Sequence, residues 1–151
     1  MGCVDAATHS RPARFEKGYR YWSTELTPEY TPYEAGLGFC VRLNKGEFIG
    51  RAALLAQKER GLNRKLCCMV LDEGAPVVWG REPILLGDEV VGRVTGGNIG
   101  HTIGRGIAYG YLPLGQAAVG TRLALDIAGE IWGTTVAAEP LWDAKNARIK
   151  A

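Results

Sequence analysis

The second half of the chain is a series of short apolar or alternating segments separated by turns, and this pattern constrains the fold most. Two pairs of segments are joined by the two-residue loops Gly87-Asp88 and Ala128-Gly129, which are typical of β-hairpins. About six short strands with glycine-rich turns predict a small closed antiparallel barrel, because closure leaves no exposed edge. The expected strands are residues 65–71, 84–86, 89–94, 107–112, 122–127 and 130–137.

The first half of the chain lacks this pattern. Residues 48–60 are rich in helix-forming residues and are followed by Gly61, which indicates a helix with a glycine C-cap. Phe48, Ala52 and Leu55 recur at helical spacing, so this side of the helix is expected to be buried. Residues 34–43 are apolar with small residues among them and predict a strand or a closely packed segment.

The predicted fold class is α+β, in which an irregular N-terminal segment and one helix lead into a C-terminal six-stranded antiparallel β-barrel. We expect three parts: a flexible lead at residues 1–13, a middle part at 14–62 and the barrel at 63–151. Residues 14–22 are expected to form a short helix or turn. The segment after the last strand breaks the alternating pattern and is expected to fold back over the barrel.

Composition and charge exclude several classes of partner. The chain has 151 residues, of which 46% are hydrophobic and 23% charged, as in globular proteins. No segment approaches the ~18 uninterrupted apolar residues that a membrane helix requires, so no membrane partner is expected. The formal net charge of +2 provides little attraction to nucleic acid, and none is expected as a partner.

The four cysteines, Cys3, Cys40, Cys67 and Cys68, do not form a disulfide framework in their spacing. Cys67 and Cys68 are neighbours in an expected strand and should point to opposite faces. No C-x-x-C pair is present and there are only two histidines, so no metal site is expected. Reduced thiols and the lack of an apolar leader in the first ten residues predict an intracellular, cytoplasmic protein.

Residues 14–55 combine aromatic side chains with charges of both signs. Aromatic faces beside fixed charges suit a flat, polar, ring-containing ligand, because rings stack while charged groups hydrogen-bond at the edge. The alternative is a surface extension whose rings pack onto a core. The aromatic residues of this run are Tyr19, Tyr21, Trp22, Tyr30 and Tyr33, and the two turn-forming prolines are Pro28 and Pro32.

The order of these residues resembles the aminomethyltransferase family, which includes the glycine cleavage T-protein, and is most similar to the C-terminal folate-binding region of sarcosine and dimethylglycine dehydrogenases. The resemblance covers residues 14 to about 148. Its motifs are Arg14-Phe15-Glu16-Lys17-Gly18, Trp22-x-x-Glu25-Leu26-Thr27-Pro28, Thr31-Pro32-x-Glu34-Ala35-Gly36-Leu37-Gly38-Phe39, Phe48-Ile49-Gly50-Arg51, Gly92-x-Val94-Thr95-Gly96-Gly97, Gly104-x-x-Ile107-Ala108-x-Gly110-Tyr111-Leu112-Pro113 and Glu139-Pro140-Leu141-Trp142-Asp143.

The resemblance implies tetrahydrofolate as the cofactor, in one-carbon transfer from glycine-, sarcosine- or dimethylglycine-type donors. Arg14 matches a cation that contacts folate in the family, and an arginine fork suits the carboxylates of the folate tail. Phe39 stands where T-proteins carry a tryptophan, and Arg81 lies two residues after the position of a pocket arginine. The folate-binding residues implied are Arg14, Glu16, Trp22, Phe39 and Arg81.

In the family the catalytic aspartate belongs to the N-terminal part of the folate domain, which would precede Arg14, so no catalytic residue is assigned. Residues 14–62 then correspond to the end of that domain. No G-x-G-x-x-G motif follows an expected strand, so no flavin is expected. The expected partners are folate and either a separate N-terminal half or a flavoprotein. The uncovered apolar face at residues 39–55 also predicts a homo-oligomer.

Other functions are compatible with parts of this pattern. The main alternative is a non-catalytic binding or assembly module that has lost the N-terminal catalytic half. An iron–sulfur assembly relative would carry cysteine after Lys17-Gly18, where this chain has Tyr19. An RNA-binding barrel is disfavoured by the near-neutral charge. Methyl transfer from a sulfonium substrate, known in the same superfamily, is a further alternative.

Overall fold

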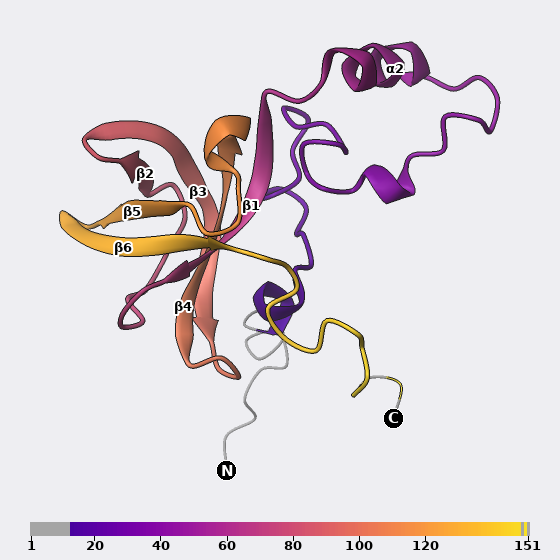
Figure 1. The fold of residues 1–151 in the computed structure, drawn as a ribbon. Helices are drawn as coiled ribbons and strands as arrows, with labels where there is room; N and C mark the ends of the chain where they lie inside the picture. The colour runs from indigo at the N-terminus through magenta and orange to yellow at the C-terminus, as the bar shows by residue number, and fades with distance from the viewer. Residues whose placement is uncertain (1–12, 149, 151) are drawn as a thin grey trace.

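The fold is known from a computed structural model that describes residues 13–148 and Lys150. Figure 1 shows a barrel at one end of the molecule and, at the other, a loop and helix that extend away from it. The predicted flexible lead at residues 1–13 lies outside the described residues except for Ala13. In the described part of the chain, no helix has the length and apolar character needed to cross a bilayer.

Six antiparallel strands form a closed barrel in the order β1-β4-β3-β2-β5-β6, which confirms the predicted architecture. Every strand pairs with two neighbours, so no edge is left open to another chain. The strands are β1 (Arg64–Leu71), β2 (Pro83–Leu86), β3 (Glu89–Gly100), β4 (Arg105–Pro113), β5 (Arg122–Ile127) and β6 (Glu130–Ala137).

Both predicted hairpins are present. Leu86 pairs with Glu89 across the first loop, and Ile127 pairs with Glu130 across the second. β3 continues past its predicted end to Gly100, because the glycines in this part of the strand allow neighbouring segments to approach its backbone closely. A Cβ on Gly97 would lie only 2.5 Å from Cγ1 of Val78. These glycines therefore permit close packing rather than ending the strand.

The strand β1 packs on both of its faces, which explains its almost continuous burial. Cys67 and Met69 belong to the cluster that fills the barrel. Leu66 and Cys68 face outward and pack with Phe15 beneath the N-terminal segment. The prediction that Cys67 and Cys68 point to opposite faces is confirmed.

The N-terminal segment, residues 14–37, packs against the outer face of β1 and β4. Residues 13–17 are helical, and the helix ends at Gly18, which has a left-handed φ of 71°. Tyr109 on β4 donates a hydrogen bond from its hydroxyl to the carbonyl of Phe15 at 3.2 Å. Tyr111, two residues further along, donates to the carbonyl of Glu25 at 2.8 Å. Two outward-facing tyrosines of β4 thus fasten this segment.

The tail after β6 folds back as predicted. The backbone N–H groups of Leu141 and Trp142 both donate to the carbonyl of Glu16, at 2.9 and 3.2 Å. Lys17 donates from Nζ to the carbonyl of Asp143 at 2.9 Å. The tail therefore encloses the N-terminal helix between itself and the barrel.

Two predictions for the middle of the chain are wrong. Residues 34–43 do not form the strand that was one of two predicted alternatives: they form turns and the short 3₁₀ helix η1 (Gly38–Cys40), and Gly36 adopts a left-handed φ of 72°. Close packing is limited to the start of this range, where Glu34 and Ala35 are buried. The helix α2 (Arg51–Arg60) ends at the predicted Gly61 cap, but Gln57 is its only buried residue. The spacing of apolar residues indicates which side of a helix can be buried, but not whether anything covers that side. No other strand or helix of the described chain packs closely on α2.

We call residues 38–60 the arm. In Figure 1 the arm carries η1 and α2 and extends away from the barrel, whereas residues 13–37 follow the barrel wall. Ala52 and Ala53 are exposed, and Leu55 is only partly buried.

Candidate functional site

Arg14 lies in the helical turn next to the barrel and is surrounded by rings and one buried acid. Its guanidinium carbon is 3.9 Å from the centre of the Phe15 ring and 5.4 Å from that of Tyr21. Its Nη1 donates a hydrogen bond to Oε2 of Glu25 at 2.9 Å, and the Glu25 side chain is 1% exposed. The Arg14 side chain remains 20% exposed. An acidic ligand would therefore share this guanidinium with Glu25.

Glu16 is buried and its carboxylate is fully engaged by a turn of the barrel. It accepts hydrogen bonds from the N–H and the hydroxyl of Thr102, at 2.7 and 2.8 Å, and from the N–H of Ile103 at 3.1 Å. A Cβ on Gly100 would lie 3.0 Å from its Oε1, so the glycine leaves room for the carboxylate. Glu16 thus joins the N-terminal helix to the β3–β4 turn.

The other three predicted site residues are exposed and separated. Trp22 follows the helical turn and is 68% exposed, while Phe39 lies on the arm and is 81% exposed. Arg81 is in the loop between β1 and β2 with a left-handed φ of 78°. Figure 1 shows η1, which contains Phe39, well apart from helical residues 13–17. Arg14, Glu16 and Trp22 share one segment, whereas Phe39 and Arg81 do not join them.

Three exposed aromatic residues follow Arg14 and form a patch that we call the aromatic strip. Tyr19, Tyr21 and Trp22 are 60%, 56% and 68% exposed. Large aromatic side chains are normally well buried, so three exposed ones within four positions favour a binding surface. The strip lies beside the Arg14 guanidinium, as the distance to the Tyr21 ring shows.

A polar cluster missed by the sequence analysis lies under the N-terminal segment. Arg20 pairs with Glu139 of the tail at 2.7 Å and donates from Nε to the carbonyl of Ala35 at 3.1 Å. The same Glu139 oxygen, Oε2, has no hydrogen bond of normal geometry in the described chain. Burial raises the pKa of Glu139, and the nearby Arg20 opposes this shift. A Cβ on Gly18 would lie 2.7 Å from this oxygen, and the left-handed φ of 71° at this position favours glycine.

Arg64 organises a second group of residues where β1 begins. Its guanidinium carbon lies 4.5 Å from the centre of the Tyr30 ring, which stacks on Tyr111 with centroids 3.6 Å apart. Its Nε donates to Oε1 of Glu34 at 3.0 Å. Burial acts to raise the pKa of Glu34, but hydrogen bonds from Thr31 and Arg64 outweigh it and lower the pKa.

These residues border a groove of about 510 Å³ that reaches the first hairpin of the barrel. None of the five predicted folate-binding residues lines it. The groove is lined by Tyr30, Asn63, Arg64, Val90, Val91, Gly92, Arg93, Tyr111 and Pro113.

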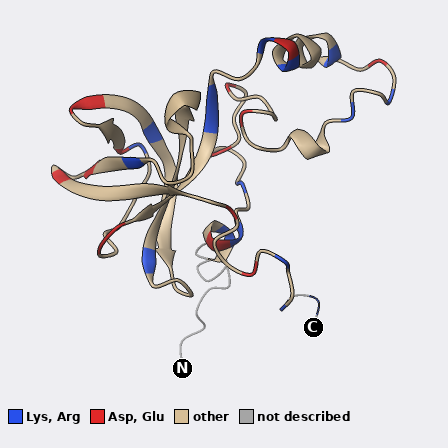
Figure 2. Ribbon diagram, in the orientation of Figure 1, with Lys and Arg blue, Asp and Glu red and all other residues tan. Residues whose placement is uncertain are grey.

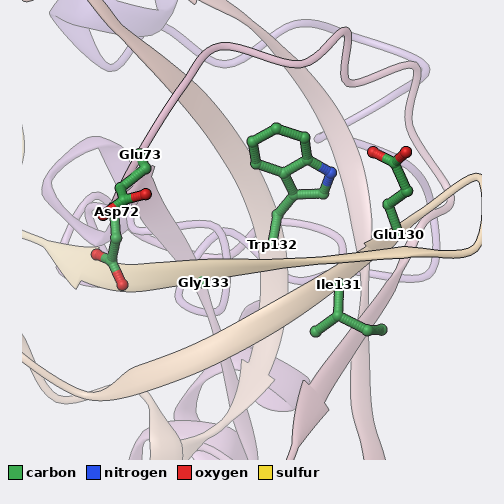
Figure 3. A pocket seen from close by; sticks show the side chains of 6 residues that line it. All are labelled: Asp72, Glu73, Glu130, Ile131, Trp132 and Gly133. Carbon is green, nitrogen blue, oxygen red and sulfur yellow. The ribbon is translucent and has the colours of Figure 1, made fainter.

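A second groove, of about 390 Å³, lies on β6 and is acidic (Figure 3). In Figure 3 the indole of Trp132 stands between Asp72 and Glu73 on one side and Glu130 on the other. Asp72 is already engaged, since the hydroxyl of Thr135 donates to it at 2.8 Å. This groove also contains none of the predicted folate-binding residues.

The two buried cysteines of β1 are not activated nucleophiles. Burial raises the pKa of Cys67 to about 11 and that of Cys68 to about 12, so both thiols stay protonated at neutral pH. His101 is exposed in the β3–β4 turn. Across residues 13–148, no group of three or more His, Cys, Asp or Glu side chains is arranged to hold a metal ion.

Signals for some of these residues are present in the sequence. Arg20 lies two positions after Gly18 of the first motif, and Glu139 precedes a proline in the motif that ends the resemblance. Their pairing spans more than a hundred positions and depends on how the tail folds back. Sequence reasoning has no local pattern for such a contact.

Comparison with known proteins relates the whole chain to one family. A family model described as the glycine cleavage T-protein C-terminal barrel domain matches residues 64–143. The mitochondrial dimethylglycine dehydrogenase of Mus musculus is 34% identical over 99% of this chain and 17% of the mouse protein. An aminomethyltransferase of Symbiobacterium thermophilum is 39% identical over 89% of this chain and 36% of that protein.

The fold is shared with a solved structure, the glycine cleavage system aminomethyltransferase T from Bartonella henselae. It superposes with a TM-score of 0.81 at 24% identity, covering 88% of this chain and 38% of the other. The chain spans between about a sixth and about two fifths of the length of these relatives. The barrel strands coincide with the matched range, and the chain belongs to the family of the glycine cleavage T-protein C-terminal barrel domain, found in aminomethyltransferases and in sarcosine and dimethylglycine dehydrogenases.

Proposed function

We propose that this chain binds tetrahydrofolate and forms the C-terminal part of a folate-dependent aminomethyltransferase-type system. The observation that carries the proposal is the Arg14 guanidinium, which lies 3.9 Å from the centre of the Phe15 ring and 5.4 Å from that of Tyr21 in the aromatic strip. Folate combines a flat ring system with carboxylates, and an arginine fork beside exposed rings suits both parts. The family membership supports the same cofactor.

The residues of the N-terminal segment fit this ligand in different ways. Arg14 would bind a carboxylate of the folate tail, and Trp22 would stack on a ring. Glu16, whose carboxylate is already satisfied, would position Arg14 and Phe15 by holding the helix on the barrel. Phe39 and Arg81 stay predicted folate contacts. Bound tetrahydrofolate would supply the nitrogen nucleophile that accepts the one-carbon unit, and the protein would supply orientation and electrostatics.

The catalytic groups would come from an N-terminal part like the one that accompanies this region in its relatives. The matched proteins are several times longer than the matched region. The donor would be an amine of the glycine, sarcosine or dimethylglycine type, and a cytoplasmic location belongs to the same proposal.

The experiment is a calorimetric titration of the chain with tetrahydrofolate, comparing Arg14→Lys with Arg122→Lys. Lysine keeps a cation for Glu25 but lacks the planar fork, so one charge-assisted hydrogen bond worth ~1.5–3 kcal/mol is lost. This predicts roughly ten- to a hundredfold weaker binding for Arg14→Lys. Arg122, an exposed arginine of β5, is the matched control and should bind as the unsubstituted chain does. Equal affinities for both variants would remove Arg14 from the site.

A second candidate function is a non-catalytic binding or assembly module. The observation that favours it is that Arg14 and Glu16 both have internal partners in the described chain. A folded chain that binds no tetrahydrofolate, with or without an N-terminal part from a relative, would support this candidate over the first.

A further inference from the structure

The groove of about 510 Å³ beside the start of β1 has an arginine on each of the two strands that flank β4. Arg64 on β1 pairs with Pro113 of β4. Arg93 on β3 pairs with Tyr111, which belongs to the outer cluster beneath the N-terminal segment. Paired residues share a face of a sheet, and so do residues two positions apart, so both arginines stand on the outer face of the barrel. β1 and β3 are about 10 Å apart across β4, because neighbouring strands are spaced by ~4.8 Å.

The two guanidinium groups keep donors that no described residue uses. Arg64 donates from Nε to Glu34 at 3.0 Å and from Nη2 to the carbonyl of Glu29 at 2.8 Å, which leaves its Nη1 without an acceptor in residues 13–148. Arg93 is exposed, and within the described chain its side chain forms no ion pair. Figure 2 shows basic positions on both strands. None of the described residues that line the groove is acidic, so the lining itself is positively charged.

Apolar groups form the rest of the groove wall. Val90, near the start of β3, is 56% exposed, and Pro113 lines the groove beside it. A volume of this size falls in the range of ~300–1,000 Å³ that is typical of small-molecule sites, which combine apolar walls with a few polar groups. The combination favours a ligand that has both an anionic group and an apolar body.

Arg64 is held in place without any ligand. Its partner Glu34 accepts hydrogen bonds from the N–H and the hydroxyl of Thr31, at 2.8 and 2.9 Å. Its guanidinium carbon also lies 4.5 Å from the centre of the Tyr30 ring. A side chain fixed in this way loses little conformational freedom when a ligand binds, so the entropic cost of binding is lower.

We propose that the groove between β1 and β3 binds a small organic oxyanion, which is a carboxylate or phosphate monoester attached to an apolar ring. The planar fork of Arg93 would bind the oxyanion through two hydrogen bonds, a geometry that suits both kinds of group. Arg64 would add the donor Nη1, and the ring would lie on Val90 and Pro113. This site is distinct from the proposed folate site, because none of the five predicted folate-binding residues lines it.

The test is a titration of the full ¹⁵N-labelled chain with four probes, followed by the NMR shifts of backbone amides. Phenyl phosphate and benzoate carry both features, inorganic phosphate lacks the ring, and benzyl alcohol lacks the charge. The amide signals of Asn63 and Gly92 report on the groove, and that of Gly129 in the β5–β6 loop is the remote reference. We expect phenyl phosphate, benzoate or both to bind at least tenfold more tightly than inorganic phosphate and benzyl alcohol.

Substitutions in the groove should weaken the binding of that probe. Arg93→Gln should weaken it roughly ten- to a hundredfold, because charge-assisted hydrogen bonds are lost. The matched control is Arg122→Gln, at an exposed arginine of β5. Val90→Asp should weaken it at least tenfold, because it places a negative charge in the groove and removes part of the apolar wall. Its matched control is Val119→Asp, since Val119 is 67% exposed and does not line the groove.

Four results would overturn the proposal. Inorganic phosphate that binds as tightly as phenyl phosphate would mean an adventitious ion only. Equal affinities of Arg93→Gln and Arg122→Gln would remove Arg93 from the site. Shifts that spare Asn63 and Gly92 would place the probe elsewhere, and failure of all four probes to bind would make the groove ordinary surface.

Tetrahydrofolate titration of the same variants separates this proposal from the proposed function. Arg93→Gln should bind tetrahydrofolate as the unsubstituted chain does, and Arg14→Lys should bind the probe as the unsubstituted chain does. A loss of tetrahydrofolate affinity in Arg93→Gln would make the groove part of the folate site and would overturn its independence. Failure of the unsubstituted chain to bind tetrahydrofolate would contradict the proposed function alone.

Discussion

Residues 14–37 and the arm follow one another in the chain, and both carry exposed aromatic rings and charges of both signs, but they relate to the barrel differently. The N-terminal segment is fastened by the hydroxyls of Tyr109 and Tyr111 and by the buried carboxylate of Glu16. The arm has no close packing with any strand, and only one residue of its helix is buried.

The difference shows that apolar composition alone does not decide which segment is fixed, because the N-terminal segment adds satisfied buried carboxylates to the buried ring of Phe15. Glu16, Glu25 and Glu34 are each less than 10% exposed, and each receives hydrogen bonds or an ion pair. A buried carboxylate is costly unless it is satisfied, so its donors must stay in place. The arm has no acid of this kind, and its acids Glu47 and Glu59 are exposed.

The largest expected effect comes from comparing one phenylalanine in each region. Phe15 is 3% exposed beneath the N-terminal segment, whereas Phe39 on the arm is 81% exposed. Phe15→Ala should reduce the free energy of unfolding by ~3–5 kcal/mol, because it removes a buried ring and leaves a cavity. Phe39→Ala should change it by less than about 0.5 kcal/mol. Urea unfolding of both variants measures the difference.

Equal losses for the two variants would contradict the distinction between the regions. In particular, a large loss for Phe39→Ala would mean that the arm is part of the cooperative fold without any partner. The Phe39→Ala variant therefore serves as the control for Phe15→Ala and also tests whether the arm contributes to the free energy of unfolding.

The barrel could be predicted from the sequence because its information is local. Alternating side chains and the loops Gly87-Asp88 and Ala128-Gly129 specify hairpins within a few residues. Helix α2 could be located for the same reason, but its burial could not. Apolar spacing identifies a potential contact face, and the existence of a contact depends on what lies beside it.

The candidate site was harder to predict because its contacts join distant positions. Thr102 and Ile103 bind Glu16 from 86 and 87 residues away, and no motif in the first half indicates them. Arg14 was identified only through the family resemblance, and its pairing with Glu25 follows from the turn between them. Positions taken over from a family therefore indicate which residues matter, while the structure shows what each one contacts.

A smaller effect is expected from removing one charge that fastens the N-terminal segment. Glu16→Gln keeps the size of the side chain but replaces one acceptor oxygen by a donor group facing the donors of Thr102. This should cost about 2 kcal/mol of unfolding free energy, since a hydrogen bond to a charged group is lost. Glu59→Gln on the arm is the matched control and should leave the urea midpoint unchanged. A Glu16→Gln midpoint equal to that of the control would show that Thr102 and Ile103 do not depend on this carboxylate.

The smallest effect concerns Glu139, where the tail meets the N-terminal segment, and it depends on pH. Burial raises the pKa of this carboxyl above its ordinary value of 4.5, although Arg20 opposes the shift. The folded chain then keeps the proton to higher pH than the unfolded chain does. Its contribution to stability is therefore complete below the unfolded pKa and is lost as pH rises through the folded pKa.

Glu139→Gln stays neutral and removes this dependence. From pH 4 to pH 8, the urea midpoint of the unsubstituted chain should fall relative to that of Glu139→Gln and then level off. The control Glu89→Gln, at an exposed position, keeps Glu139 and should show the same fall relative to Glu139→Gln. The sign is the decisive part. A midpoint that rises relative to Glu139→Gln would mean that the attraction of Arg20 outweighs burial, so that the tail would be fastened by an ion pair as the N-terminal segment is at Arg14.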